Sequence, residues 1–156
     1  MPVESIKGID LSFPGPCQEG WTKFKAYCYL VSDQIKSQSA AKQWCSEKGA
    51  DLVKIESAKE NQFVLELVKE KAPSLKQVWI GLEWHRNAFY WSDLSVPGYN
   101  NWAPGEPNGK ASEPCGHMYV GGYPNELPGR ASGYWNDIGC AGRSDYPNGI
   151  VCMKLP

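Results

Sequence analysis

Six cysteines, at positions 17, 28, 45, 115, 140 and 152, constrain this 156-residue chain more than any other feature. They form no C-x-x-C pair, and the chain has only two histidines, which excludes zinc-finger and thioredoxin patterns. An even number of scattered cysteines in a loop-rich chain indicates three disulfides, which persist in oxidising compartments. The alternative is six buried free thiols in a cytosolic protein. We expect a secreted, extracellular protein whose signal peptide is absent from this sequence.

The charge balance excludes several classes of partner. The chain has 16 Lys and Arg residues and 17 Asp and Glu residues, which gives a net charge of −1. The chain therefore lacks the excess of basic residues that nucleic-acid binders have, and it has no Lys/Arg cluster that would bind an anionic membrane surface. No apolar run is long enough to span a bilayer. We therefore expect no nucleic-acid partner and no membrane insertion.

Hydrophobic periodicity predicts one domain over residues 17–156, preceded by an extended tail over residues 1–16. A hairpin over 21–31, closed by a Cys17–Cys28 disulfide, comes first. Two helices are expected, one over 37–48 before Gly49 and one from the capping box of Ser57 and Glu60 to the residue before Pro73. Strands are expected over 52–55, 78–82, 89–91, 118–120 and 150–153. The core residues should include the apolar face of the second helix and Trp79, Trp91, Trp102 and Trp135, and we expect His85 and His117 to have surface or core roles.

From Ser92 to Gly149 the chain is dominated by Gly, Pro, Asn, Asp and Ser, a stretch far longer than an ordinary connection. It carries five oxygen-bearing side chains close to rigid elements: Glu106, Asn108, Glu113, Asn136 and Asp137. Calcium takes roughly six to eight oxygen ligands, and three carboxylates with two amides suit it. Pro107 predicts a fixed turn, for which a cis peptide is one form. The alternative is that these are ordinary polar loop residues.

No catalytic constellation stands out in the sequence. The chain has no G-x-S-x-G nucleophile elbow and no phosphate-loop spacing, and neither histidine has a nucleophile at a recognisable spacing. Paired acids could hydrolyse glycosides, but a bound ion would occupy the same residues. We therefore expect no enzymatic activity.

An ordered set of motifs resembles the C-type lectin domain family over residues 17–156. The matching segments are Ala41-x-x-x-Cys45-x-x-x-Gly49-Ala50-x-Leu52-x-x-Ile55, Trp79-Ile80-Gly81-Leu82, Glu106-Pro107-Asn108, Glu113 before Cys115, and Trp135-Asn136-Asp137, followed by Cys140 and Cys152. The resemblance implies an α+β fold in which two helices flank small antiparallel sheets, with a long calcium-binding loop region. It also implies the long form of the domain, with disulfides Cys17–Cys28, Cys45–Cys152 and Cys115–Cys140.

The same resemblance implies calcium as cofactor and glycans on glycoproteins or cell surfaces as partners. Both the ion and the sugar would be held by Glu106, Asn108, Glu113, Asn136 and Asp137. In the family, Glu-Pro-Asn accompanies mannose, fucose or N-acetylglucosamine, whereas Gln-Pro-Asp accompanies galactose. The acids that form auxiliary calcium sites in relatives are missing here, so one ion is expected. A homo-oligomer or clustered glycans would supply avidity.

Two alternatives remain open at this point. A domain of this fold could bind a galactose-type sugar, or it could have turned to a non-sugar surface such as a protein or ice. The segment 121–134 is longer than usual for the family, and Tyr123 or Arg130 would contact a second sugar residue if this segment forms a wall. Otherwise it is a solvated insertion.

Overall fold

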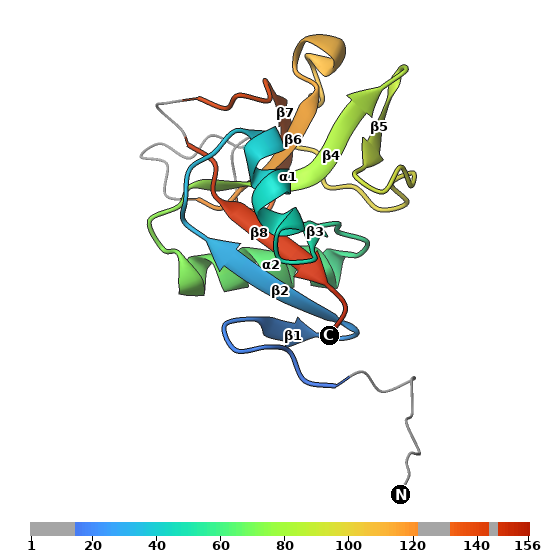
Figure 1. Ribbon diagram of the computed structural model, residues 1–156. Helices are drawn as coiled ribbons and strands as arrows, with labels where there is room; N and C mark the ends of the chain where they lie inside the picture. The colour runs from blue at the N-terminus through green and yellow to red at the C-terminus, as the bar shows by residue number, and fades with distance from the viewer. Residues whose placement is uncertain (1–14, 122–131, 144–146) are drawn as a thin grey trace, which may run out of the picture.

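A computed structural model describes residues 15–121, 132–143 and 147–156, and these form two four-stranded sheets and two α-helices (Figure 1). The elements are β1 (Thr22–Phe24), β2 (Tyr27–Ser32), α1 (Gln38–Ser46), β3 (Asp51–Leu52), α2 (Ala58–Lys71), β4 (Gln77–His85), β5 (Ala88–Trp91), the short 3₁₀ helix η1 (Lys110–Ser112), β6 (Cys115–Tyr119), β7 (Trp135–Ile138) and β8 (Ile150–Lys154). The predicted α+β class with three disulfides is confirmed, and the pairings are those expected: Cys17–Cys28, Cys45–Cys152 and Cys115–Cys140.

The first sheet has the order β1-β2-β8-β3 and brings the two ends of the domain together (Figure 1). The predicted hairpin is present, because Phe24 pairs with Tyr27 around a turn at Lys25 and Ala26. Lys154 on β8 donates to the side chain of Gln18 at 2.9 Å. The predicted tail over residues 1–16 lies almost entirely outside the described residues.

Both helices are preceded by a capping serine; the sequence predicted the cap at Ser57, and at Ser37 it predicted only the start of a helix. Ser37 accepts a hydrogen bond from the N–H of Ala40 at 3.2 Å, and Ser57 accepts one from the N–H of Glu60 at 3.1 Å. The Glu60 carboxylate reaches back to the N–H of Glu56 at 2.8 Å, one residue before the capping position. Gly49 has a φ of +70°, the conformation expected just beyond α1.

The second sheet has the order β5-β4-β6-β7 and carries the long loop region. Two expectations need correction here. The strand predicted over 118–120 begins at Cys115 as β6, and β7 was not predicted as a strand at all. Both strands contain polar or small residues that hide the alternating pattern, and they pair with each other across a long intervening segment.

The core has two clusters of buried side chains. The larger lies between α2 and the sheets, and it includes the predicted residues Val64, Leu67 and Val68 together with Trp91 and Trp135. The smaller lies under α1 and includes Trp79 and the Cys45–Cys152 disulfide. Of the four tryptophans expected in the core, three are fully enclosed and the fourth, Trp102, packs against the larger cluster while partly exposed.

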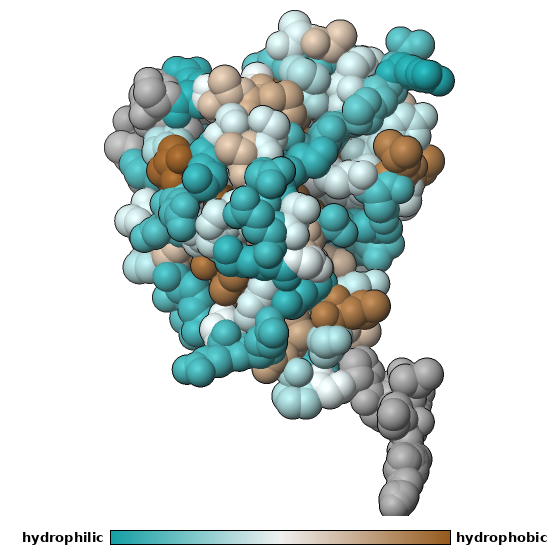
Figure 2. Space-filling view, viewed as in Figure 1, coloured by the Kyte–Doolittle hydropathy of each residue, from teal (hydrophilic) through white to brown (hydrophobic). Residues whose placement is uncertain are grey.

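The surface in view is mainly hydrophilic, with apolar patches that stand apart from one another (Figure 2). The exposed large apolar side chains among the described residues are Ile35, Leu94, Val96 and Leu155. None of the described helices combines the length and apolar character that crossing a membrane requires.

Candidate metal centre

The loop that carries Glu106 and Asn108 is held against β7 by backbone hydrogen bonds. Trp135 donates its N–H to the carbonyl of Asn101 at 2.9 Å, and its own carbonyl accepts from the N–H of Ala103 at 2.9 Å. These two bonds flank Trp102, which forms an isolated parallel bridge with Trp135. The predicted ligands from positions 106–108 and 136–137 are therefore brought to one end of the second sheet.

Trp135 is fixed from its other side by a residue on α2 that the sequence did not single out. Asn61 is buried, and its Oδ1 accepts the indole N–H of Trp135 at 2.8 Å. The Asn61 amide donates to the carbonyl of Gly133 at 3.0 Å, and Asn101 donates to the same carbonyl at 2.7 Å. The amide of one helix residue thus orients the strand that carries Asn136 and Asp137.

Asp137 is buried and organises the loop through main-chain donors. Its Oδ1 accepts from the N–H of Asn108 at 3.1 Å, and its Oδ2 accepts from the N–H groups of Gly109 and Lys110 at 2.8 and 2.7 Å. The Glu106–Pro107 bond is cis, as the proline suggested. Asp137 was expected only as a ligand, and the structure adds this role in folding the loop.

Glu106 contains a buried oxygen, Oε1, that has no hydrogen-bond partner among the described residues. Burial, together with the neighbouring Asp137 and Glu113 carboxylates, raises the pKa of its carboxyl group to about 7. A buried carboxylate beside other acids costs free energy unless a proton or a cation compensates it. Glu106 is therefore the residue at which a positive charge is most needed.

Glu113 follows η1 and folds back onto the loop. A Cβ placed on Gly109 would lie 2.3 Å from Oε1 of Glu113, so only glycine leaves room for this side chain. Burial, and then the charge of Asp137, raise the pKa of the Glu113 carboxyl group. The next residue, Pro114, is tied to β4 because its carbonyl accepts from the N–H of Trp84 at 2.8 Å.

Asn136, which is half-buried, adjoins two buried polar residues, His117 and Asn148. Its Nδ2 lies 2.9 Å from Nε2 of His117, and Nδ1 of His117 lies 2.9 Å from Oδ1 of Asn148. His117 is 2 % exposed and Asn148 is 1 % exposed. Burial lowers the pKa of His117 to about 4, so the imidazole is neutral at physiological pH. The sequence predicted a surface or core role for His117, and the buried position agrees with it, but the contact with a predicted ligand was missed.

The donor set suits a hard cation such as calcium on chemical grounds. The set contains three carboxylates and two amides, Oε1 of Glu106 has no donor among the described residues, and burial and then Asp137 raise the pKa of Glu106 and of Glu113. Among the described residues, however, no three His, Cys, Asp or Glu side chains converge as a ready-made metal cage. Any ion here depends on the amide and main-chain oxygens of Asn108 and Asn136 as well. Tyr123 and Arg130, the suggested wall residues, lie outside the described residues.

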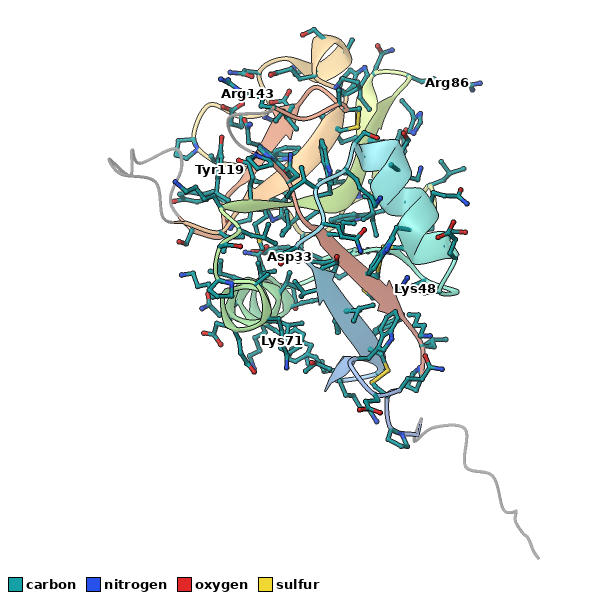
Figure 3. The ribbon with its side chains drawn as sticks, turned by 60° about the vertical axis from the view of Figure 1, so that its left-hand side comes forward. Asp33, Lys48, Lys71, Arg86, Tyr119 and Arg143 are labelled. Atoms are coloured by element: carbon teal, nitrogen blue, oxygen red, sulfur yellow. A yellow bond between two sulfur atoms is a disulfide. The ribbon has the colours of Figure 1, made fainter. Side chains whose placement is uncertain are left out.

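The loop that precedes β6 lies at the opposite end of the molecule from β1 (Figure 1). Figure 3 shows Arg143 and Tyr119, which is on β6, in the upper part of the view, with Lys71 at the end of α2 below them. The β1–β2 hairpin of the first sheet, with its Cys17–Cys28 disulfide, is thus remote from the candidate metal centre. The candidate site lies on β7 and on the loop that precedes β6.

Comparison with known proteins agrees with this architecture. The model of the lectin C-type domain matches residues 34–154. The chain is 33% identical over 131 residues to the perlucin-like protein of Mytilus galloprovincialis, which covers 81% of this chain and 78% of that protein. It is 35% identical over 142 residues to the low affinity immunoglobulin epsilon Fc receptor of Mus musculus, which covers 89% of this chain but 37% of the receptor.

A solved structure shows the same fold. The cow C-type carbohydrate-recognition domain of CD23 superposes with a TM-score of 0.73 at 30% identity, over 90% of this chain and 97% of that one. The family consists of non-enzymatic carbohydrate-binding or recognition proteins. The matched segment, the relatives and the shared fold together show that this chain belongs to the C-type lectin domain family.

Proposed function

We propose that this chain binds one calcium ion through Glu106, Asn108, Glu113, Asn136 and Asp137, and recognises sugars at the same site. The observation that carries the proposal is the buried Oε1 of Glu106, which has no donor among the described residues and sits beside two further acids. Cation binding would neutralise this cluster. The three disulfides support an oxidising, extracellular location for this function.

The residues of the site suit the recognition of neighbouring sugar hydroxyls. Bound calcium supplies a cationic centre whose coordination positions can take hydroxyl oxygens. The Glu106 and Glu113 carboxylates can accept hydrogen bonds from sugar hydroxyl groups, because an ionised carboxylate is an acceptor only. Asn108 and Asn136 can donate amide N–H groups to the hydroxyl oxygens. Each hydroxyl would thus meet a donor and an acceptor arranged in a fixed order.

Mannose-type sugars, meaning mannose, fucose and N-acetylglucosamine, are the proposed ligands. The Glu106-Pro107-Asn108 sequence supports this choice. The cow domain similar to this chain was crystallised in the presence of a GlcNAc2Man3 oligosaccharide. A second similar structure, 26% identical with a TM-score of 0.71, is the complex of SPL-1 with GlcNAc.

A glycan array with calcium and with excess EDTA tests the proposal. We expect binding to mannose-type glycans in calcium and its loss in EDTA. The double variant Glu106→Gln with Asn108→Asp should shift binding toward galactose, and Glu70→Gln, an exposed acid on α2, should change nothing. Binding that persists in EDTA would refute the calcium mechanism, and a native preference for galactose would refute the assigned specificity.

A non-sugar ligand is the rival from another class. It is favoured by one similar protein, the mouse receptor, whose name gives an immunoglobulin Fc region as its ligand. The same array decides between the two, because a protein-binding domain would leave every glycan unbound while isothermal titration still detects calcium.

A further inference from the structure

The polar row Asn148–His117–Asn136, in which Asn148 and His117 are buried, links the second sheet to one proposed calcium ligand. His117 lies opposite Trp79 of β4 and opposite Asn136 of β7, so the imidazole and the Asn136 amide are neighbours by strand register. The rings of Trp79 and Tyr119 lie 6.4 and 5.1 Å from the imidazole centroid. His117 therefore has little freedom to turn.

The hydrogen-bond pattern fixes which nitrogen of His117 carries the proton. An amide NH₂ group can only donate, so Nε2 of His117 must accept from Nδ2 of Asn136. The proton then lies on Nδ1, which donates to Oδ1 of Asn148. All three groups agree on one direction of donation along the row.

This direction leaves Oδ1 of Asn136 free to face a cation. An amide has one oxygen, and no donor among the described residues engages it. One N–H of the amide is used by His117, and the second remains for a ligand hydroxyl. Turning the amide over would place its oxygen against the lone pair of Nε2. To avoid that contact, the His117 proton would have to move and the Asn148 amide would have to turn as well.

We infer that His117, held by Asn148, is a positioning residue that directs the amide oxygen of Asn136 toward the calcium site. The inference rests on the proposed function and deepens it. Partners that orient metal ligands commonly contribute tenfold to a hundredfold in metal affinity. His117 itself touches neither the ion nor the sugar in this role.

The first experiment reads the tautomer directly in the native chain. Long-range ¹H–¹⁵N spectra of the two imidazoles, recorded with and without calcium, should show His117 with its proton on Nδ1 in both conditions. His85→Gln assigns the signals, because His85 is the other histidine. A proton on Nε2 of His117 would overturn the inference whether or not calcium binds.

The second experiment measures the calcium dissociation constant by titration calorimetry. We expect His117→Leu to weaken calcium binding by about tenfold or more, because leucine cannot accept the hydrogen bond from Asn136. His117→Gln keeps an acceptor and should recover most of the affinity. Met118→Leu, a conservative core change in the same strand, is the matched control and should bind as the native chain does.

The outcomes separate the inference from the proposed function. A native chain that binds no calcium refutes the function, and this role with it. A native chain that binds calcium, with His117→Leu binding equally well, refutes the role alone. Loss of affinity in His117→Leu with recovery in His117→Gln supports the role, since a purely structural cavity would not discriminate by hydrogen-bonding capacity. If His117→Leu fails to fold, the tautomer of the native chain still decides.

Discussion

Replacing Glu106 with glutamine should stabilise the calcium-free domain at neutral and alkaline pH. Glutamine has nearly the same shape and removes the charge that burial, Asp137 and Glu113 disfavour. Its amide N–H can also donate to the Asp137 carboxylate. The native carboxyl group has a raised pKa, so its contribution to stability is fully present below its usual pKa of 4.5 and is lost as the pH rises through about 7.

The size of the effect follows from that pKa. It is raised from 4.5 to about 7, and each pKa unit corresponds to about 1.36 kcal/mol. Ionising Glu106 in the folded chain therefore costs at most about 3.4 kcal/mol more than in the unfolded chain. Because the side chain is partly exposed, solvent screening reduces the expected gain for Glu106→Gln to about 1–2 kcal/mol at pH 8.

Urea unfolding in EDTA at pH 5 and pH 8 measures this gain, with Glu70→Gln as the exposed control. Glu106→Gln should be more stable than the native chain at pH 8, and the difference should shrink at pH 5. In saturating calcium the order should reverse, because ligand at a hundredfold excess over its dissociation constant stabilises the native chain by about 2.7 kcal/mol. A Glu106→Gln chain that is less stable than the native one in EDTA at pH 8 would refute the reasoning.

Three further predictions concern the ion, the disulfides and the helix contact. Calcium affinity measured by calorimetry should fall as the pH drops below about 7, the raised pKa of Glu106, because protons compete with the ion. An affinity that stays unchanged between pH 8 and pH 5 would contradict this prediction. Replacing Cys45 and Cys152, which are 107 residues apart, by alanine should lower the free energy of unfolding by about 5 kcal/mol, because the unfolded chain gains entropy. Replacing Cys17 and Cys28, which are 11 residues apart, should lower it by about 3 kcal/mol. Chemical denaturation should show that order, and equal losses would contradict it. Asn61→Ala should lower the free energy of unfolding by about 1–3 kcal/mol, because the indole N–H of Trp135 loses its hydrogen-bond partner. A melting temperature equal to that of the native chain would refute this prediction.

Local signals in the sequence predicted the helices well. Ser37 and Ser57 supply caps that depend on neighbours three residues away, so a short window of sequence contains the whole interaction. The first hairpin and β8 were also visible from their apolar runs. The candidate ligands were identified through motif order, and as a ligand set they stay a prediction.

What the sequence did not reveal depends on distant partners. The contact between Asn61 and Trp135 joins residues 74 positions apart, and the sequence around either residue contains no signal that predicts it. The strand β7 was missed because Asn136 and Asp137 looked like loop ligands. His117 meets Asn136 only through the register of β6 and β7, which pairs these residues although they are 19 positions apart.

The way Asp137 holds the loop has a consequence for how specificity can evolve. Its three partners at positions 108–110 are main-chain N–H groups, which every amino acid except proline provides. The side chain at position 108 can therefore be exchanged while the loop keeps its anchoring. Selection can test new residues at the sugar-facing position, and random libraries can do the same, with little of the folding penalty that usually limits such change.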